Sequence, residues 1–441
     1  MKQKRKREIR QIVVIGGGAA GLLAAIAAAE DGAQVTILEH KEQLGKKILS
    51  TGNGRCNLGN RRMEPDCYHS RQQAFPWKVL RQFGLEENIR FWEKLGMVIK
   101  DKNGYLYPWS ESAAAVAELL QQEIHRLGVE VITECHVSAV RAAGVVESAK
   151  PTEAAWRPSV QEKRKKGNIW AVSTDRGEFL CERVILAAGS KAASVLGSDG
   201  SGYDIAEKLG YSLVPVLPAL VQLRCQGTFF KAWSGVRTEA KVTLFVDGVQ
   251  AACDAGEVQL TDYGVSGIPV FQVSRFAAIG LYQGKKVEAV LDFLPFLEGE
   301  QRKKDWFSKR LAQLSGKTAE EFLCSVLHKK LIGVLLRCAK IQPDMPVAEI
   351  GKSTLEKLYQ VLSAFRLTVT ETNSFEQAQV CCGGVDVRQV DAQTLESKLH
   401  RGLYFAGEIL DVDGICGGYN LQWAFSSGSV AGKAAAASFR E

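Results

Sequence analysis

The first forty residues alternate between apolar runs and glycine-rich or polar breaks. Ile12 to Ile15 is a continuous apolar run with the length of a buried strand, and Val35 to Leu38 is a second one. Between them, the small apolar residues from Leu22 to Glu30 have the length of a helix, and Gly16 to Gly21 is suited to a tight turn. This order predicts a βαβ unit, in which a turn and a helix join two parallel strands.

A membrane segment is the competing interpretation of the same stretch. Ile12 to Ala29 contains no charge in eighteen residues and follows a basic decapeptide, which is how signal peptides and membrane anchors begin. Eleven of the eighteen residues are Gly or Ala, however, and each of the three consecutive glycines 16–18 weakens a helix by about 1 kcal/mol. We therefore expect neither export nor membrane insertion, and a cytoplasmic location.

The glycine turn has the residue types that a dinucleotide site needs. Gly16 permits the sharp turn from strand to helix, Gly18 lets a pyrophosphate approach the main chain, and Gly21 lets the helix lie close to the sheet. The free N–H groups and partial positive charge of the helix N-terminus favour the phosphates. Glu39 ends the second strand eighteen residues after Gly21, where a carboxylate can accept hydrogen bonds from a ribose. Dinucleotide binding is therefore favoured over a simple glycine-rich turn.

Further elements of an α/β fold follow along the chain. Ser112 to Leu127 places five apolar side chains on one helical face, and the stretches Val129 to Ile132 and His136 to Val140 have the pattern of short strands. Val184 to Ala187 is another apolar strand, with Gly189 just after its carboxyl end. Ligands of doubly wound sheets bind at such strand ends.

The middle of the chain changes character. The charged stretch between Ala143 and Asn168 has little periodicity and predicts a mobile loop, and its Lys163 to Lys166 run is interpreted as solvated. Tyr211 to Phe296 contains many short β-like runs between turn residues, which predicts an inserted β domain. Glu300 to Phe365 has a mostly helical pattern.

The C-terminal segment repeats the order of strand, glycine-containing turn and helix that the N-terminal segment has. Leu403 to Ala406 is predicted as a strand, Gly407 and Glu408 follow it, and the pair Gly417-Gly418 precedes a helix of small residues from Asn420. This helix either aims a second N-terminus at a ligand or is simply a tightly packed terminal helix. We expect the two ends of the chain to form one discontinuous nucleotide domain, with the middle inserted.

Composition narrows the class of protein further. The chain has 441 residues and eleven cysteines, and no Cys-x-x-Cys pair occurs, so we expect a reducing compartment and no metal site. Cys381 and Cys382 are adjacent, which favours a strand with one side chain on each face over a disulfide. The net charge is +7, but residues 1–10 carry +5 of it. The nearly neutral remainder does not favour RNA as a partner, although a basic tail can add phosphate contacts.

Four motifs resemble the flavoproteins of the BaiN/RdsA type, which are described as NAD(P)/FAD-dependent oxidoreductases. The motif that begins at Gly256 has Leu260-Thr261-Asp262 where the family commonly has Phe-Thr-His. The stretch "CCGGVDVRQVD", which also resembles the family, has Asp386 where Ser is common. The motifs are "VVIGGGAAGLLAAI" with Glu39, "GKKILSTGNGRCNLGN" from Gly45, "GEVQLTDYGVSGIPVFQ" from Gly256 and "LESKLHRGLYFAGEILDVDGICGGYNLQWAFSSG" from Leu395.

The resemblance implies an extended FAD with its adenosine end on residues 16–39 and its isoalloxazine near residues 52–57 and 418–421. The expected cofactor-binding residues are Gly16, Gly18, Ala19, Ala20, Gly21, Glu39, Lys47, Gly52, Asn53, Arg55, Cys56, Asn57, Val137, Ala188, Gly189, Gly407, Glu408, Gly418, Asn420 and Leu421. Arg55 has two equal interpretations, as a counter-charge for a phosphate or substrate anion or as a residue that holds its loop.

The fold class expected from the resemblance is α/β, with a discontinuous Rossmann-like FAD-binding domain, an inserted β-rich domain and a small helical domain. The expected domain bounds are residues 1–190 and 371–441 for the FAD-binding domain, 191–298 for the β-rich domain, which we expect to shape the substrate pocket, and 299–370 for the helical domain.

The most strongly indicated activity is NAD(P)H-driven reduction of an activated C=C bond in a small molecule, such as a bile-acid-type enone. The alternatives are oxidation of an aminoacetone-type amine, reduction of a ribosomal uridine, and a flavin-binding sensor without catalysis. An ene-reductase needs a hydride donor, an acid and a donor to the carbonyl oxygen. The candidate donors are Tyr263, Thr261, Tyr419 and Cys56, although a packed or flavin-adjacent neutral thiol is the favoured interpretation of Cys56. The sequence does not specify an oligomeric state.

Overall fold

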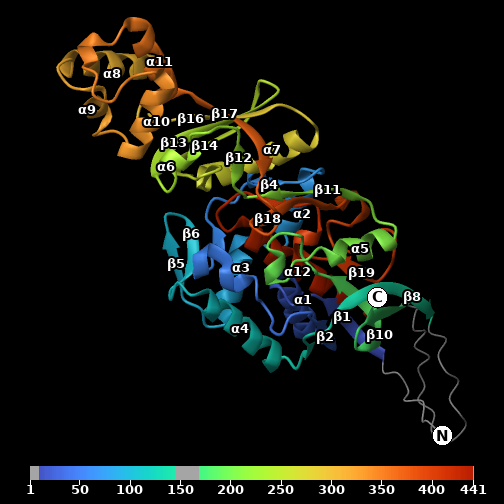
Figure 1. Ribbon diagram of the computed structural model, residues 1–441. Helices are drawn as coiled ribbons and strands as arrows, with labels where there is room; N and C mark the ends of the chain where they lie inside the picture. Colours follow the sequence, from blue (N-terminus) through green and yellow to red (C-terminus); the bar gives the residue numbers. More distant parts are fainter. Residues whose placement is uncertain (1–8, 146–167, 441) are drawn as a thin grey trace, which may run out of the picture. The chain divides into compact units, whose positions relative to one another are not determined.

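The computed structural model describes residues 9–145 and 168–440 (Figure 1). The predictions for the basic N-terminus up to residue 8 and for the charged insertion 146–167 lie outside the described residues. The chain divides into two compact units. Unit 1 comprises residues up to Val216 together with Cys381 onwards, and unit 2 comprises Leu217–Val380.

A seven-stranded sheet forms the centre of unit 1. Four of its pairings are parallel, and helices separate these parallel partners along the chain, as expected for βαβ units. Strands β8, β9 and β10 instead pair antiparallel, with no helix described between them. The strands lie in the order β7 (Glu130–Ile132), β2 (Val35–Leu38), β1 (Ile9–Ile15), β10 (Gly177–Leu186), β9 (Asn168–Thr174) and β8 (Val137–Val145), and β19 (Leu403–Phe405) also pairs with β10.

The helices of unit 1 arise from both ends of the chain. The two that matter most for the site are α1 (Ala19–Glu30) and α12 (Tyr419–Ala437), whose small side chains are nearly all buried. The others are α2 (Ala74–Leu80), α3 (Leu85–Lys94), α4 (Ala113–Arg126) and α5 (Ser201–Lys208), with 3₁₀ turns at η1 (Ile48–Gly54), η2 (Pro65–Cys67), η3 (Ser194–Leu196), η5 (Val387–Gln389) and η6 (Gly407–Ile409).

Three small sheets complete unit 1 and its connection to unit 2. They are β3 (Gly59–Asn60) with β6 (Tyr105–Pro108) and β5 (Ile99–Lys102), β4 (Tyr68–His69) with β20 (Asp413–Gly414), and β11 (Leu213–Ala219) with β18 (Val380–Val385). The chain enters unit 2 within β11 and returns to unit 1 within β18. Cys381 and Cys382 both lie in β18, and neither forms a disulfide.

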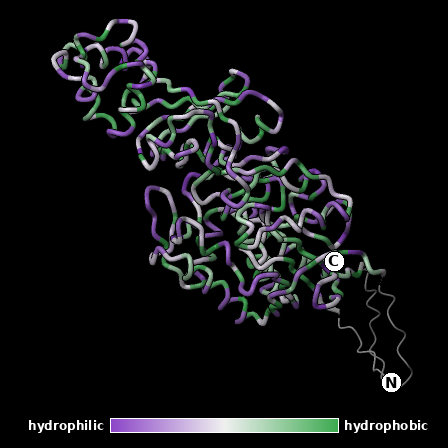
Figure 2. The backbone as a smooth tube through the Cα atoms, in the orientation of Figure 1, coloured by the Kyte–Doolittle hydropathy of each residue, from purple (hydrophilic) through white to green (hydrophobic). Residues whose placement is uncertain are grey.

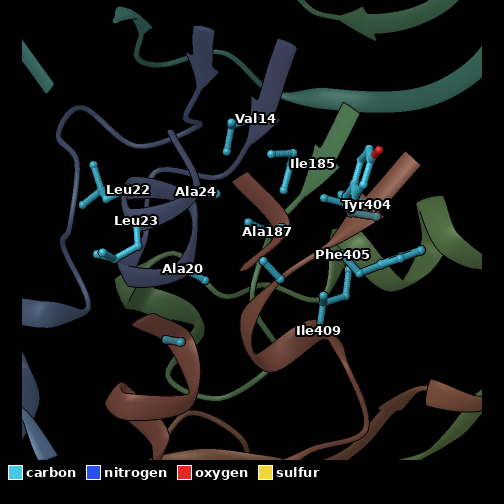
Figure 3. Close-up of a cluster of buried hydrophobic side chains, with 14 of the residues drawn as sticks. Val14, Ala20, Leu22, Leu23, Ala24, Ile185, Ala187, Tyr404, Phe405 and Ile409 are labelled. Carbon is cyan, nitrogen blue, oxygen red and sulfur yellow. The ribbon is translucent and has the colours of Figure 1, made fainter. Parts of the chain in front are cut away.

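The core of unit 1 joins the sheet to both terminal segments. Figure 3 shows Val14 of β1, Ile185 of β10 and Phe405 of β19 in one cluster with Ala20 and Leu23 of α1. Hydrophobic residues gather along these central strands and helices (Figure 2). Burial of this apolar surface explains why segments from the two ends of the chain fold together, and it confirms the discontinuous α/β domain.

Unit 2 contains a closed barrel and a group of helices. The barrel strands follow the order β12 (Leu223–Cys225), β15 (Gly264–Gly267), β14 (Val249–Leu260), β13 (Arg237–Val246), β16 (Val287–Asp292) and β17 (Phe365–Thr372), and β17 pairs with β12 to close it. The helices are α6 (Phe230–Trp233), α7 (Ile268–Tyr282), α8 (Glu300–Gln313), α9 (Ala319–Leu323), α10 (Lys329–Ala339) and α11 (Lys352–Ser363), with one 3₁₀ turn, η4 (Val347–Glu349).

The observed units differ from the expected domain bounds at both junctions. Residues 191–216, expected in the inserted domain, belong to unit 1, and residues 371–380, expected in the FAD-binding domain, belong to unit 2. The first shift arises because α5 packs in the unit 1 core, and the second because β17 runs to Thr372 as a barrel strand. The barrel and the helices of unit 2 share one core, so a separate helical domain stays a prediction. No helix in the described ranges is long and apolar enough to cross a membrane.

Candidate FAD site

The glycine turn between β1 and α1 is shaped by close backbone contacts. Gly16 has φ +103°, and a Cβ there would lie 2.5 Å from the carbonyl oxygen of Ala187. A Cβ on Gly21 would lie 1.9 Å from the carbonyl oxygen of Gly16, so only glycine lets α1 pack against the turn. At Gly18, by contrast, a Cβ would meet nothing within 4 Å. The open space at Gly18, at the N-terminus of α1, suits an approaching pyrophosphate.

The helix α1 begins three residues earlier than predicted, at Ala19, directly after this turn. Its N-cap is Gly18, which provides no side-chain hydrogen bond, and its first turn contains no acidic residue. The first amides of a helix have no partner within the helix. The amides at Ala19, Ala20 and Gly21 are therefore suited to an anionic ligand.

Glu39 is fixed beside the turn by main-chain donors. Its Oε2 accepts from the Gly17 amide at 2.7 Å and its Oε1 from the Lys41 amide at 2.8 Å, while His40 Nδ1 lies 3.2 Å from Oε1. Burial alone raises the pKa of this carboxyl, but the hydrogen bonds from His40, Lys41 and Gly17 outweigh it and hold the pKa below its ordinary value. The carboxylate is thus ionised, and its remaining lone pairs can accept from ribose hydroxyls.

The segment before β8 lies against the same acid. The amide of Cys135 donates to the carbonyl oxygen of Glu39 at 2.9 Å, and the amide of Glu39 donates to that of Ile132 at 2.9 Å. Val137, the first residue of β8, follows two residues later and is buried. The segment that carries Val137 is therefore hydrogen-bonded to Glu39, and a role of Val137 in holding the adenosine end stays a prediction.

The strand end of β10 lies beside the glycine turn. A Cβ on Gly16 would lie 3.1 Å from Ala188 Cα, so Ala188 directly contacts the turn. The next residue, Gly189, has φ +76°, and a Cβ there would lie 2.8 Å from Ser198 Oγ. Both predicted residues thus lie at the carboxyl end of the central strands, where doubly wound sheets bind ligands.

A polar trio links three distant segments beside the first residues of α1. Lys47 Nζ lies 2.8 Å from Glu408 Oε2, and Ser190 Oγ donates to the same oxygen at 3.2 Å. Both charged side chains are at most a quarter exposed. The trio provides a cation and a hydroxyl that suit an anionic or hydroxyl-bearing ligand, and Ser190 was not predicted from the sequence.

A close contact with α1 explains why Gly407, the residue before Glu408, is a glycine. It has φ +81°, and a Cβ there would lie 2.7 Å from Ala20 Cβ in α1. Its amide donates to Ser427 Oγ at 2.9 Å, and its carbonyl accepts from Trp423 Nε1 at 3.1 Å. Two side chains of α12 therefore fix the position of Gly407 against α1.

The second predicted helix opening lies at the N-terminus of α12, which begins at Tyr419. Its N-cap, Gly418, has φ +96° and provides no side-chain hydrogen bond. A Cβ on Gly418 would lie 2.6 Å from Asn57 Oδ1, and Asn60 Nδ2 donates to the carbonyl of Gly417 at 3.3 Å. The loop 51–60 and the opening of α12 therefore meet within unit 1, as predicted.

The side chains of Asn420 and Leu421, in the first turn of α12, make contacts within the protein. Asn420 Oδ1 accepts from the Gly414 amide at 2.8 Å and its Nδ2 donates to the Gly414 carbonyl at 2.9 Å, so this side chain is used by the loop before the helix. Leu421 packs against the core. Both residues can therefore hold a flavin only through their main-chain amides.

Tyr419 is one of the candidate proton donors, but it is the first residue of α12 and is buried. Its ring packs edge-on against Tyr68 with centroids 5.9 Å apart, and its carbonyl accepts from the Tyr68 hydroxyl at 3.1 Å. Burial and the neighbouring Cys67 raise the pKa of its hydroxyl. These contacts give Tyr419 a structural role.

The loop at Gly52–Asn57 combines exposed main chain with a buried thiol. Gly52, Asn53 and Cys56 all have positive φ, near 55°, which is uncommon for residues other than glycine. Arg55 is half-exposed, 3.9 Å from Glu111, and its Nε donates to Gly52 at 3.4 Å. These contacts are consistent with Arg55 holding the loop, one of its two predicted roles.

Cys56 is fully buried, and burial raises the pKa of its thiol to about 12 despite a hydrogen bond with Thr51. The thiol is therefore neutral near neutral pH, in agreement with the interpretation as a packed residue. A nucleophilic or acid role would leave a buried thiolate, which is costly.

The two helix openings have a defined offset because α1 and α12 pack closely. A Cβ on Gly428 would lie 2.2 Å from the Ala20 carbonyl, and a Cβ on Gly432 would lie 2.2 Å from the Ala24 carbonyl. Both contacts advance by four residues, so the helices run parallel, and the start of α12 precedes that of α1 by roughly 12 Å at 1.5 Å per residue. An extended dinucleotide spans such a distance.

The candidate donors Thr261 and Tyr263 belong to unit 2. They lie in the turn between β14 and β15, where the Thr261 carbonyl accepts from Trp233 Nε1 at 3.1 Å and Thr261 Oγ1 lies 3.5 Å from the Tyr263 amide. Thr261 thus stabilises the turn. The Tyr263 hydroxyl accepts from Asn373 Nδ2 at 3.0 Å, a partner that sequence reasoning missed.

These features fit FAD. Two uncapped helix N-termini, open space at Gly18 and an ionised Glu39 provide what a dinucleotide's phosphates, ring system and ribose require. The fold and this site define the chain as an FAD-dependent oxidoreductase with a Rossmann-type domain. It belongs to the HI0933-like family, whose model, described as the HI0933-like protein Rossmann domain, matches residues 10–434 and confirms the resemblance predicted from the sequence motifs.

Curated relatives cover nearly the whole chain. The chain is 46% identical over 430 residues to a 3-dehydro-bile acid delta(4,6)-reductase of Clostridium scindens, covering 97% of this chain and 99% of that protein. It is 29% identical over 423 residues to a ribosomal RNA dihydrouridine synthase of Haemophilus influenzae, covering 94% and 96%. A protein of the same name from Escherichia coli is 27% identical over 416 residues, covering 94% and 95%.

Proposed function

We propose that this protein reduces an activated C=C bond of a small-molecule enone, of the 3-oxo-4-ene bile-acid or steroid type, with FAD as cofactor and NAD(P)H as electron donor. The observation that carries the proposal is the 46% identity to a bile-acid reductase over nearly the full length of both chains. FAD supplies hydride chemistry when bound and reduced.

The residues of unit 1 would hold the cofactor with main-chain amides at two helix N-termini and with the side chains of Glu39, Lys47 and Ser190. The amides of Ala19, Ala20 and Gly21 would bind the pyrophosphate and Glu39 the adenosine ribose, while Lys47 and Ser190 would orient the intervening chain. The amides of residues 419–421 would face the flavin pyrimidine ring. There the positive end of the α12 dipole stabilises negative charge, which favours the reduced cofactor.

The sequence contains one dinucleotide fingerprint, at Gly16–Gly21. A nicotinamide donor therefore would bind transiently, without a dedicated domain of its own. A second candidate function, reduction of a ribosomal uridine, is favoured by the two relatives named ribosomal RNA dihydrouridine synthases. It too adds hydrogen across an activated C=C bond, but its substrate is a polyanion.

The experiment that tests the proposal uses the purified yellow holoprotein without oxygen. NADH or NADPH should bleach the flavin absorbance, and addition of a 3-oxo-4-ene bile acid should restore it in step with formation of the saturated ketone. Bleaching only by an amine, with peroxide formed in air, would instead support an oxidase. Tightly held FAD without turnover of alkene or amine would support a sensor.

A parallel measurement distinguishes the RNA alternative. Fluorescence anisotropy with ribosomal RNA fragments at increasing salt should show only weak binding that lacks uridine reduction. Tight, salt-sensitive binding together with dihydrouridine formation, and no reduction of the bile acid, would overturn the proposal in favour of the RNA substrate.

A further inference from the structure

A hairpin in unit 1 carries aromatic and basic side chains on one of its two faces. Its strands are β5 and β6 (Figure 1), which pair antiparallel and place Lys100 opposite Tyr107 and Lys102 opposite Tyr105. Residues directly opposite each other in such a pair project to the same side, and so do residues two positions apart along a strand. The two lysines and the two tyrosines therefore share one face of the hairpin.

The same face continues past the ends of the two strands. The amide of Trp109 donates to the carbonyl of Val98 at 2.8 Å, which extends the pairing by one position. Lys100 Nζ lies 5.5 Å from the centroid of the Trp109 ring, so the indole lies on the side of the lysines. Trp109 and Val98 are both 65% exposed, whereas Leu106 and Pro108, which project to the opposite side, are buried. The hairpin therefore packs its β6 side chains on one face and leaves aromatic surface open on the other.

The charge of this face is concentrated around Glu111, three residues after β6. Lys100 Nζ lies 2.7 Å and Lys102 Nζ 2.6 Å from Glu111 Oε1. Arg55 Nη1 lies 3.9 Å from the other carboxylate oxygen, Oε2. The hydrogen bonds from the two lysines lower the pKa of this carboxyl to about 2, so it stays ionised. One carboxylate cannot neutralise three cations, and these are 32%, 42% and 50% exposed, so the face presents positive charge to a ligand.

This face borders the expected position of the flavin ring within unit 1. A Cβ on Gly417, just before α12, would lie 3.1 Å from Cε1 of Tyr105, and a Cβ on Gly52 would lie 3.9 Å from Cε1 of Tyr107. Both tyrosine rings therefore lie against the segments that we propose to hold the isoalloxazine. Arg55 belongs to one of these segments, where its Nε donates to the Gly52 carbonyl. A ligand on this face would lie beside the flavin ring.

Aromatic faces next to cations are suited to nucleotides. Base rings stack on aromatic side chains, and phosphates accept charge-assisted hydrogen bonds from lysine and arginine. A pyrophosphate, with more than one negative charge, matches a group of three cations better than a single carboxylate does. A nicotinamide dinucleotide contains both rings and a pyrophosphate. The sequence has one dinucleotide fingerprint, which the proposed function assigns to FAD, so the electron donor needs a second place to bind.

We propose that this face is the docking site of the NAD(P)H donor, and we name it the donor face. Its residues are Arg55, Lys100, Lys102, Tyr105, Tyr107 and Trp109. The phosphates would bind the three cations, and the adenine would stack on Trp109, which leaves the nicotinamide on the side of Tyr105, next to the start of α12. The two aromatic residues are separated by roughly 13 Å along the strand, so one dinucleotide can contact both. The inference rests on the proposed function, and it involves residues of unit 1 alone.

The test measures bleaching of the flavin in the holoprotein by NADH and by NADPH, in an anaerobic stopped-flow experiment without bile acid. The dependence on donor concentration gives the donor Kd and the limiting rate. The double variant Lys100→Met/Lys102→Met should raise the Kd by about tenfold or more, because charge-assisted hydrogen bonds to phosphate are lost. Its FAD content should be normal and its limiting rate within about threefold of wild type. Trp109→Ala should raise the Kd by about fivefold or more.

The matched control is Arg61→Met. Arg61 is 50% exposed and pairs with Asp101 at 3.0 Å, whose side chain projects to the opposite face of the same hairpin. This variant should keep the donor Kd within about twofold of wild type. Added salt should weaken donor binding to the wild type, and less so to the double lysine variant, because fewer charges remain to be screened. Lysines that only stabilised the hairpin would leave this salt dependence unchanged.

A second set of measurements separates the donor from other ligands. After reduction by dithionite, wild type and the double lysine variant should be reoxidised by the bile acid with KM values that agree within about threefold. A double-variant donor Kd within about twofold of wild type would overturn the inference. If that variant instead weakened binding of the bile acid or of ribosomal RNA fragments, the face would belong to that substrate.

Failure of the proposed function has a different signature. A wild-type protein that neither NADH nor NADPH bleaches, but that reduces the bile acid after dithionite treatment, would overturn the donor face and leave alkene reduction intact. A protein that does not reduce the bile acid even then would overturn the proposed function. A donor Kd that depends on Lys100 and Lys102 would still support the donor face in that case.

Discussion

The FAD site of unit 1 and a hydrogen-bonded cluster of Tyr263, Asn373 and Arg224 in unit 2 are built on opposite principles. The first consists mainly of main-chain groups at helix openings, where glycines permit close approach, and its contacts depend on a few local turns. The second consists of side chains whose contacts depend on closure of a barrel. The contacts of the first region need main-chain groups, which every residue has, whereas the contacts of the second region need particular side chains.

The largest effect on stability is expected at the glycines of the turn between β1 and α1, where Gly21 allows close packing and Gly18 leaves room for the ligand. Gly21→Val would force a side chain against the Gly16 carbonyl. Because a backbone carbonyl cannot move aside as a flexible side chain can, this variant should destabilise the FAD-free protein by about 3 kcal/mol or more. Gly18→Val faces open space and should leave the stability of the FAD-free protein within about 1 kcal/mol of wild type while weakening FAD binding by about tenfold or more. Thermal unfolding and FAD titration measure both; equal destabilisation by the two variants would contradict the assignment.

The next effect concerns Glu39. Glu39→Gln should weaken FAD binding by about tenfold, because the charged acceptor of two main-chain amides and a ribose is lost. Since the folded-state pKa of Glu39 is lowered, its stabilising contribution is complete above the unfolded pKa of about 4.3 and is lost as the pH falls through the lower folded value.

The difference in unfolding free energy between wild type and Glu39→Gln should therefore be constant from about pH 8 to pH 5 and shrink below about pH 4. Urea unfolding at a series of pH values provides this difference. A difference that grows on acidification would show that the carboxyl has a raised pKa.

A smaller effect is expected for the link between the chain's two ends. Lys47→Met removes the cation from the partly buried Glu408 and should destabilise the protein by about 1 kcal/mol. The adjacent Lys46 pairs with the exposed Glu42 four residues earlier in the same turn region, so Lys46→Met should cost about 0.3 kcal/mol or less. Chemical denaturation of both variants decides whether burial of the Lys47 pair matters, and equal costs would indicate that it does not.

The smallest effect is expected at Cys56. Because burial raises its pKa to about 12, the thiol should resist iodoacetamide in the folded protein, while the exposed Cys253 and Cys324 react. Cys56→Ala should keep activity within about threefold of wild type, since the thiol has a packing role. Mass spectrometry of the alkylated peptides checks the reactivity, and selective labelling of Cys56 would contradict a neutral, packed thiol.

Much of unit 1 was predictable because its determinants are local. Short sequence patterns indicate the glycine turn, the apolar strands β1 and β2 and the position of Glu39. A similar pattern of strand, glycines and helix near Gly418 indicates the second helix N-terminus. Ser190 and Gly17 were missed because each acts on a carboxylate that is distant in sequence.

Unit 2 was predictable only as a β-rich insert with helices. Closure of the barrel by β12 and β17 joins residues near 224 and 370, and no periodicity within either segment indicates its partner. For this reason no sequence pattern indicated the hydrogen bond between Asn373 and Tyr263, and Tyr263 itself was suggested only as one of several candidate donors. The packing of Tyr419 was not predictable because its sequence neighbours are glycines and polar residues, whereas its packing partner Tyr68 is 351 residues earlier in the chain.

The most direct test of the central claim, that helix openings from both ends of the chain hold one FAD, is a crystal structure of the FAD complex. The account predicts a single extended FAD, with its pyrophosphate on the amides of Ala19–Gly21, its ribose on Glu39 and its isoalloxazine against the amides of Tyr419–Leu421. A flavin whose ring system lies away from the start of α12, or whose pyrophosphate is bound elsewhere than the turn at Gly18, would contradict it.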